Sequence, residues 1–306
     1  MILCGSSDQG ALKYFRAINL KKIIVIEKKK TISKFSKLKQ KPKLVLTGSA
    51  LGYSIDKKLI KFAKKNKILS VSIIEHWTNF IDRFKIGNKL YFPDLIFVND
   101  KFSFNQALRE GIPKKKLKIM GNVYFEKLSK KKFFKSSSKK IKKIKTKSSK
   151  IIMFISENIK GQKKIQNEYS SNEFETIKKI KKILNKEDTL IIKCHPEEKL
   201  KKFNKIKSKN ILIIKKMSFQ DMIFSPNYII GMKSILLLEL GIFRNDIISF
   251  RPKKDKAFIG EKLKITKLIR SLSGLSGNLI KNDNKFFKNY FNGSSKKIDS
   301  FIKDYI

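Results

Sequence analysis

The sequence predicts an α/β fold made of two successive halves, each with its own parallel sheet, and three observations support this. Short runs rich in Ile, Val and Leu alternate with longer amphipathic runs, which is typical of βα units. The 306 residues suffice for two ordinary domains. The alternation stops once, in a stretch dominated by Lys and Ser, and then restarts. We therefore expect an N-terminal domain over residues 1–127, a linker over 128–150 and a second domain over 151–306. A basic surface helix is the alternative for the linker stretch.

Six short apolar runs predict the strands of the first half. They are Ile2–Gly5, Lys22–Glu27, Leu44–Gly48, Leu69–Glu75, Leu95–Asn99 and Leu117–Gly121. Helices fall between these strands, because apolar residues recur at helical spacing within residues 12–20 and 55–63. A further helix ends before Gly111, and Pro113 follows two residues later.

The second half repeats the alternation. Its predicted strands are Ile151–Ile155, Leu190–Cys194, Ile211–Ile214, Tyr228–Ile230 and Ile247–Phe250, and its predicted helices are Phe174–Leu184 and Ser234–Leu240. In doubly wound parallel sheets, ligands bind beyond the carboxyl ends of the strands. The loops that directly follow the predicted strands are therefore the candidates for function.

The positive charge of the chain is extreme but is spread along its length. The sequence has 72 Lys and Arg against 25 Asp and Glu, a formal net charge of +47, which ordinarily indicates nucleic acid or an anionic membrane as partner. Arg is scarce, however, and the abundance of Lys, Ile, Asn and Phe fits the codon bias of an A/T-rich bacterial genome. We therefore expect no specific nucleic-acid partner. Part of the charge remains available for peripheral contact with an anionic inner membrane or for phosphate-bearing substrates.

The cysteines and the apolar runs indicate a cytoplasmic protein. Cys4 and Cys194 are too few for a disulfide framework and lack the spacing of a metal cluster. The opening apolar run ends at Gly5, so it is interpreted as a strand and not as a signal peptide. The most apolar stretch, residues 228–243, is interrupted by charged residues and falls short of the roughly 20 residues that span a bilayer. We expect no metal and no transmembrane anchor.

Both histidines of the chain, His76 and His195, directly follow a predicted strand. Pro196 after His195 fixes the turn and removes a backbone donor, which would aim the imidazole out of the sheet. Near neutral pH, such a group can donate a hydrogen bond to a phosphate oxygen or assist a leaving group. A histidine that satisfies buried carbonyl groups is the structural alternative. We take His195 as a catalytic candidate and Lys193, two residues earlier, as a donor-binding one.

A second candidate loop joins the strand ending near Gly231 to an apolar helix. Gly231-Met232-Lys233-Ser234 would offer backbone amides, the helix dipole, a cation and a hydroxyl to an anionic diphosphate. Glu239 interrupts the apolar helix and could bind a ribose, or it could face solvent. The Gly-x-x-x-x-Gly-Lys and Gly-x-Gly-x-x-Gly patterns are absent, which disfavours a nucleotide kinase or an ordinary dehydrogenase. We expect no cofactor.

Polar and small residues also follow strands in the first half. Loops with Gly5 and Gly48 allow a substrate to approach the backbone closely. The run Glu75-His76-Trp77 resembles a sugar surface, since aromatic faces pack on pyranose rings while polar groups fix hydroxyls; a core position is the alternative for Trp77. The candidate acceptor-binding residues are Gly5, Ser6, Gly48, Ser49, Trp77 and Arg83. The candidate general bases are Asp8, Glu75 and His76, and the sequence does not choose among them.

Two patches resemble the GT-B superfamily, which contains many glycosyltransferases and the non-hydrolysing UDP-N-acetylglucosamine 2-epimerases. Residues 93–100, Gly111-Ile112-Pro113 and residues 118–122 are similar to the last strand–helix–strand unit of an N-terminal GT-B domain, with Val123 in place of the usual proline. Residues 192–196 resemble the His-Pro motif of bacterial sialyltransferases and of capsule and teichoic-acid polymerases. There, the resemblance implies, the histidine contacts the nucleotide phosphate, and Ser234 with Glu239 match a phosphate-binding helix start and a ribose-binding acid.

The resemblance implies two Rossmann-like domains facing each other across a cleft, a nucleotide-sugar substrate and no obligatory metal. Our leading hypothesis is a metal-independent glycosyltransferase that transfers a sugar or related group to a surface polysaccharide or lipid-linked acceptor. His195 and the Gly231–Ser234 loop would stabilise the departing phosphate. The first alternative is a nucleotide-sugar 2-epimerase of the same fold. The second is a non-catalytic basic protein that binds nucleic acid or membrane.

Overall fold

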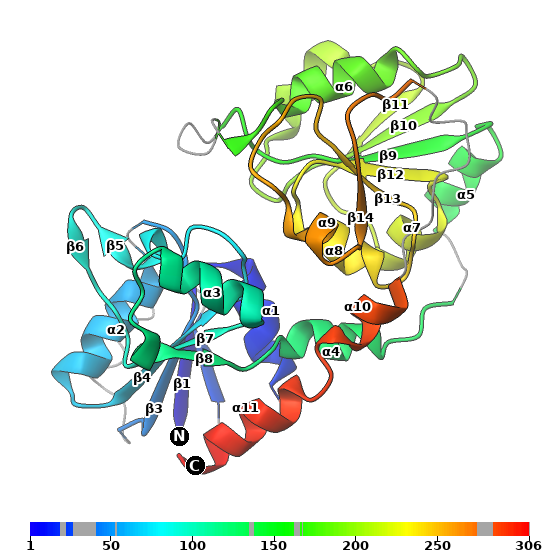
Figure 1. The fold of residues 1–306 in the computed structure, drawn as a ribbon. Coiled ribbons are helices and arrows are strands. Elements are labelled where there is room, and N and C mark those ends of the chain that lie inside the picture. Colours follow the sequence, from blue (N-terminus) through cyan, green and yellow to red (C-terminus); the bar gives the residue numbers. More distant parts are fainter. Residues whose placement is uncertain are drawn as a thin grey trace. The chain divides into compact units, whose positions relative to one another are not determined.

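The computed structural model describes residues 1–18, 23–26, 41–52, 54–134, 138–161, 166, 168–273 and 284–305. The chain divides into two compact units: unit 1 comprises Met1–Lys130 and Asn289–Ile306, and unit 2 comprises Lys131–Lys288. Each unit contains a six-stranded parallel sheet flanked by helices (Figure 1). The predicted α/β class is confirmed.

The sheet of unit 1 has the strand order β2-β1-β3-β4-β7-β8. Its strands are β1 (Ile2–Gly5), β2 (Ile23–Ile26), β3 (Leu44–Thr47), β4 (Leu69–Ile74), β7 (Leu95–Val98) and β8 (Leu117–Ile119), and a separate hairpin joins β5 (Lys85–Ile86) to β6 (Lys89–Leu90). Strand β1 pairs with β2 on one side and with β3 on the other. The direction of strand addition therefore reverses between β1 and β3, which is where doubly wound sheets bind ligands.

Helices cover both faces of this sheet. They are α1 (Gln9–Ala17), α2 (Ile55–Lys65), α3 (Lys101–Arg109), α4 (Val123–Ser129) and α11 (Ser294–Lys303). Because successive side chains of a strand point to opposite faces, Ile2 and Cys4 join the core that contains α1 and α11, whereas Leu3 joins the core that contains α2. The sheet is thus buried on both faces, as its uninterrupted apolar strands require.

Unit 2 repeats the design with the strand order β11-β10-β9-β12-β13-β14. Its strands are β9 (Ile151–Ile155), β10 (Thr189–Lys193), β11 (Ile211–Ile214), β12 (Tyr228–Gly231), β13 (Ile247–Phe250) and β14 (Thr266–Ile269). Its helices are α5 (Lys139–Lys145), α6 (Glu173–Lys181), α7 (Phe219–Phe224), α8 (Ile235–Gly241) and α9 (Ile259–Lys262); α10 (Asn284–Tyr290) spans the point where the chain returns to unit 1. Here the strand order reverses between β9 and β12.

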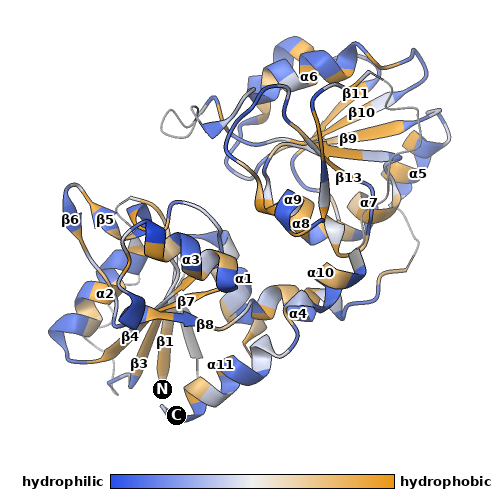
Figure 2. Cartoon of the chain, viewed as in Figure 1, coloured by the Kyte–Doolittle hydropathy of each residue, from blue (hydrophilic) through white to orange (hydrophobic). Residues whose placement is uncertain are grey.

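Local sequence explains where the helices begin. Asp8 caps α1 by accepting a hydrogen bond from the backbone N–H of Gly10. Asn172 and Glu175 form a reciprocal capping box at the start of α6. Figure 2 shows the apolar residues concentrated along the strands of both sheets, with hydrophilic residues along the helices. Burial of the apolar strands and capping of the helix ends therefore both stabilise this fold.

The structure differs from the sequence predictions in three places. The second domain does not extend to residue 306, because residues 289–306 belong to unit 1, where Ile298 and Ile302 enter its core. The stretch 128–150 is not a simple linker, since residues 139–145 form α5, the basic helix that was the alternative. Strand β14 was not predicted. Lys22 and Glu27, the predicted ends of β2, lie outside the described residues. None of the helices in the described ranges is long and apolar enough to cross a membrane.

Candidate functional site

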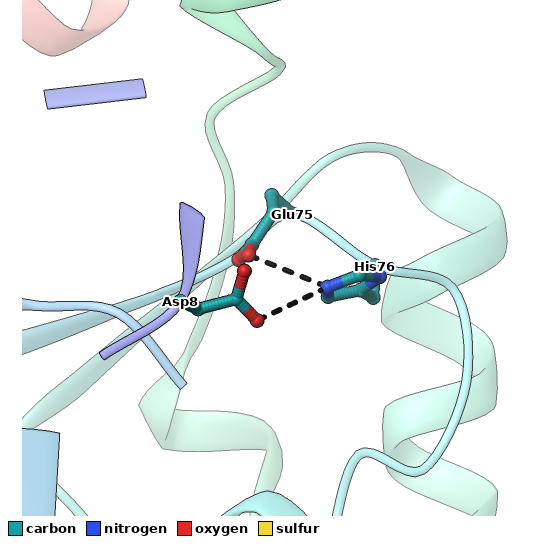
Figure 3. Close-up of side chains that lie close together, drawn as sticks. All are labelled: Asp8, Glu75 and His76. Carbon is teal, nitrogen blue, oxygen red and sulfur yellow. Dashed lines mark hydrogen bonds and ion pairs between the residues drawn. The ribbon is translucent and has the colours of Figure 1, made fainter. Parts of the chain in front are cut away.

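Three titratable side chains meet at the carboxyl ends of β1 and β4 in unit 1. Asp8 follows β1, and Glu75 and His76 follow β4. The His76 Nε2 atom lies 3.3 Å from Asp8 Oδ2 and 3.4 Å from Glu75 Oε1, so one imidazole nitrogen faces both carboxyl groups (Figure 3). The three predicted candidates for a general base therefore form a single cluster.

The loop after β1 holds Asp8 in place. The Ser6 hydroxyl accepts a hydrogen bond from the Asp8 backbone N–H and donates one of 2.7 Å to Asp56 Oδ1. Gly48 lies against this arrangement, because a Cβ atom there would collide with the Ser6 hydroxyl and the Asp56 carboxylate. Ser6 and Gly48, both predicted acceptor residues, thus support the loop that carries Asp8.

Glu75 is buried without a hydrogen-bonding partner. Its exposed fraction is 6%, and neither carboxyl oxygen accepts a hydrogen bond from the residues that the structure describes. Burial, and then the negative charge of Asp8, raise the pKa of Glu75 well above its ordinary value. A Cβ atom on Gly10 would lie 2.8 Å from Glu75 Oε1, so the glycine provides the space that Glu75 occupies. These surroundings favour the neutral, protonated form of the Glu75 carboxyl group.

Asp8 has the opposite character. Burial alone would favour its neutral form, but the hydrogen bond and charge of His76, together with the Gly10 N–H, lower the pKa of Asp8 below its usual range. Burial and the nearby Arg83 cation lower the pKa of His76. The hydrogen bond between His76 Nε2 and Asp8 Oδ2 favours the ionised form of Asp8. About a quarter of the Asp8 and His76 side chains is exposed, so solvent-borne molecules can reach them.

Arg83 and Trp77 are interior residues of unit 1. Arg83 is 5% exposed and donates to the backbone oxygens of Ser49 and Thr78, which fixes the loop after β3. Trp77 is also 5% exposed; its indole N–H donates to Asp100 Oδ2 at 2.7 Å. Phe125 packs against the Trp77 ring edge to face. These contacts fit the core position that was the alternative for Trp77, and its predicted acceptor contact is not carried further.

Asp8, Glu75 and His76 together can transfer protons. The pKa of Glu75 is raised and that of Asp8 is lowered, and such a separation of pKa values is typical of an acid and a base. Each of the three side chains offers one possible metal-ligand atom, and these atoms all lie within 4.8 Å of one another. This spacing could also hold a divalent cation. The expectation that the protein works without a metal remains a prediction.

In unit 2, His195 lies at the carboxyl end of β10 and is partly exposed. Its Nδ1 atom accepts a hydrogen bond of 3.2 Å from the Glu197 N–H, so the neutral ring carries its proton on Nε2. Glu198 Oε2 accepts the His195 backbone N–H at 2.7 Å. Burial lowers the pKa of His195, and Glu197 opposes this. The hydrogen bonds of this turn thus orient a neutral imidazole to donate from Nε2.

The loop after β12 donates hydrogen bonds to the Glu157 carboxylate. The amides of Met232 and Lys233 donate to Glu157 Oε1 at 3.1 and 2.8 Å. The Lys233 ammonium pairs with Asp255 at 3.3 Å. Two of the amides predicted to receive a diphosphate therefore bind a carboxylate in this structure.

The remaining residues predicted to bind the nucleotide-sugar donor differ in their burial and in their hydrogen bonds. Ser234 caps α8 through a hydrogen bond from the Leu236 N–H. Glu239 is 4% exposed, so the solvent-facing alternative for it is wrong. The Lys193 ammonium donates to the Cys194 carbonyl oxygen. Whether these residues contact a ligand stays a prediction.

Two buried acids of unit 2 were not among the predicted site residues. Glu157 follows the end of β9 by two residues, and Glu198 follows His195 by three residues. Glu198 accepts hydrogen bonds from the Ser156 hydroxyl at 3.0 Å and from the Lys202 ammonium at 2.7 Å. The position of Glu157 after a strand was a signal that could have identified it.

The fold and these strand-end sites define a two-domain, Rossmann-like protein of GT-B type. Solved structures share this fold over nearly the whole chain. A complex of S. aureus MnaA with UDP has a TM-score of 0.67 at 14% identity and covers 99% of this chain and 96% of that one. The Methanocaldococcus jannaschii UDP-GlcNAc 2-epimerase with UDP-GlcNAc and UDP has a TM-score of 0.62 at 16% identity, covering 100% and 99%. Anabaena Alr3699/HepE with UDP and glucose has 0.56 at 9%, covering 98% and 94%. No protein-family profile and no curated protein matches the sequence.

Proposed function

We propose that this chain is an enzyme that acts on a UDP-activated sugar and inverts the sugar at the carbon next to its anomeric carbon. The observation that carries the proposal is the Asp8–Glu75–His76 cluster, in which an ionised and a protonated carboxyl group flank one imidazole nitrogen. Several similar structures are named as 2-epimerases of this substrate class, which supports epimerisation over glycosyl transfer. Glycosyl transfer is the leading hypothesis from the sequence, and the similar structures favour its alternative, epimerisation.

Inversion of a ring carbon requires a base that removes a proton and an acid that returns one. The C2 hydrogen of a sugar is not acidic, so its electron pair needs an acceptor. As the base removes the C2 proton, the C2–H electron pair forms a C1–C2 double bond and the diphosphate leaves C1 with the C1–O electron pair; the reverse addition returns the diphosphate to C1 and a proton to the other face of C2. Asp8, ionised and partly exposed, is the proposed base. Glu75, protonated in its buried position, is the proposed acid.

In unit 2, we assign the diphosphate to the carboxyl ends of the strands. His195 presents a neutral imidazole whose Nε2 proton can be donated to a phosphate oxygen. The Met232 and Lys233 amides become available only if Glu157 moves away from them. A nucleotide would therefore compete with a carboxylate for these donors.

The test is incubation of the protein with UDP-N-acetylglucosamine alone in D₂O, followed by proton NMR. The expected result is an epimer, with solvent deuterium at C2 and no added acceptor. Glu75→Gln should slow deuterium incorporation by about 10²–10⁴-fold, because a general acid is lost. Glu187→Gln, which removes an exposed acid of unit 2, is the matched control and should keep full activity. Parallel reactions with a chelator report any need for a metal.

A separate measurement tests whether the nucleotide binds at His195. His195→Ala should weaken UDP binding by about tenfold in a thermal-shift titration, because one hydrogen bond to a charged group is removed. Uridine without phosphate should bind both proteins equally. Equal UDP affinity for the two proteins would rule out His195 as a phosphate ligand, and CMP, CDP and GDP in the same titration test the choice of base.

Transfer of the sugar to a polysaccharide or lipid-linked acceptor is the second candidate. The His76–Asp8 hydrogen bond of 3.3 Å favours it, because an imidazole oriented by a carboxylate can deprotonate an acceptor hydroxyl. This candidate predicts UDP release only when an acceptor is added, and no deuterium at C2 of the donor.

A further inference from the structure

A lysine-rich segment begins near the first residue of unit 2 and continues through α5. Residues 127–150 contain twelve lysines and no Asp, Glu or Arg. Lys and Arg account for 72 of the 306 residues of the chain, so this segment carries about twice the average density of positive charge.

Three contacts fix this segment along α7. The Phe133 ring packs against the Phe219 ring with centroids 5.4 Å apart. The Ser138 N–H donates to Asp221 Oδ1 at 3.0 Å. The Lys145 ammonium donates to the Phe224 carbonyl oxygen at 2.7 Å. The segment is therefore attached to unit 2 on both sides of residues 135–137.

Ile141 of α5 is buried, whereas several other side chains of the segment are exposed. Phe134 is 80% exposed, the most exposed of the large apolar side chains in the described residues. Five lysines of the same segment are exposed and make no ion pair with any carboxylate that the structure describes. We call Phe134 and these lysines the basic strip: Lys131, Lys132, Phe134, Lys139, Lys142 and Lys143.

We propose that the basic strip docks unit 2 on an anionic lipid bilayer. Unpaired lysines are attracted to the negative surface of anionic lipids, and the attraction grows with each added lysine. An exposed phenyl ring next to such charges can enter the apolar boundary of the headgroups, which removes its surface from water. The strip is independent of the cluster at Glu75.

The composition of the strip favours a membrane over nucleic acid. Recognition of base edges in nucleic acid relies heavily on the bidentate guanidinium group of Arg, and residues 127–150 contain no Arg. Lysine with an exposed aromatic residue instead matches polybasic membrane attachment, where charge density counts and hydrogen-bond geometry does not.

The experiment is co-sedimentation of the full chain with phosphatidylcholine vesicles, with and without about a third of phosphatidylglycerol. We expect binding only to the anionic vesicles, and release as the salt is raised from about 0.05 M to about 0.5 M. Lys139→Gln, Lys142→Gln and Lys143→Gln together should weaken partitioning by about 100-fold. Phe134→Ser should weaken it by about tenfold.

The matched control removes three exposed lysines at the end of α6: Lys178→Gln, Lys181→Gln and Lys182→Gln. It lowers the net charge equally and should bind the vesicles within about twofold of the unmodified chain. Equal losses for the two triple variants would overturn the proposal, because they would show attraction by net charge alone. Tighter binding to single-stranded RNA than to anionic vesicles at the same salt would also overturn it. Circular dichroism confirms that each variant is folded.

Discussion

Asp8 and Glu75 contact the same imidazole nitrogen at 3.3 and 3.4 Å, and their surroundings give them opposite charge states. Asp8 receives hydrogen bonds from His76 and from the Gly10 N–H. Glu75 receives none from the described residues and is deeply buried. Hydrogen bonds favour the charged form of a carboxyl group, and burial favours the neutral form. At the scale of residues, the two carboxyl groups therefore differ because Asp8 accepts hydrogen bonds and Glu75 accepts none from the described residues.

The raised pKa of Glu75 predicts how the free energy of unfolding depends on pH. Glu75 keeps its proton in the folded state above its ordinary pKa of 4.5, whereas the unfolded chain releases it. The contribution of Glu75 to the free energy of unfolding is thus fully present below pH 4.5 and is lost as pH rises through the folded-state pKa. Relative to Glu75→Gln, the unmodified protein should lose up to about 1.4 kcal/mol per pH unit in this interval.

Urea unfolding over a series of pH values measures this difference. The control is Asp82→Asn, since Asp82 is an exposed acid of unit 1; its curve should parallel that of the unmodified protein. If the curve for Glu75→Gln is also parallel, Glu75 has an ordinary pKa and the assignment of the acid fails.

At the scale of elements, the loop after β10 depends on one buried acid. Glu198 is 1% exposed and accepts hydrogen bonds from the His195 N–H, the Ser156 hydroxyl and the Lys202 ammonium. Its carboxylate thus joins the loop after β10 to the loop after β9. The orientation of the His195 turn follows from this connection.

Replacing Glu198 by Ala should lower the free energy of unfolding by about 3 kcal/mol, because buried donors lose their acceptor. Glu197→Ala, at an exposed position in the same turn, should change it by less than about 0.5 kcal/mol. Chemical denaturation measures both. Similar small effects in the two variants would show that the Glu198 contacts contribute little.

Sequence patterns predicted elements well and their assembly less well. β1, β9, β11 and β13 have the predicted bounds because continuous runs of Ile, Leu and Val identify buried parallel strands. β14 was missed because Lys267 interrupts a short run. The polar residues Asp8, Glu75 and His76 were identified one by one from their places after strands. Their meeting follows from the pairing order of β1, β3 and β4, which local patterns do not contain.

At the scale of the whole molecule, α11 carries the end of the described chain back into unit 1. Ile298 and Ile302 are 1% and 0% exposed and share a core with β1 and β4. Phe301 packs edge to face on Phe97 of β7, with ring centroids 4.9 Å apart. The core of unit 1 is therefore completed by residues that follow unit 2 in the sequence.

Ile302→Ala should destabilise unit 1 by about 2–5 kcal/mol, the usual cost of truncating a fully buried aliphatic side chain. Hydrogen exchange should show faster exchange of the amides in β1 and β4, with unchanged protection in β9 and β10. Lys303→Ala, one residue further on an exposed position, should leave both sheets protected. Loss of protection in β9 instead would contradict the division of the chain into these units.

Because residues 131–288 are contiguous and the two parts of unit 1 flank them, unit 2 is in genetic terms an insertion into unit 1. Two separate stretches of polypeptide connect the units, so cutting one connection would leave them joined through the other. Ribosomal synthesis also delivers α11 after all of unit 2. The complete core of unit 1 can therefore form only once the inserted unit has been made.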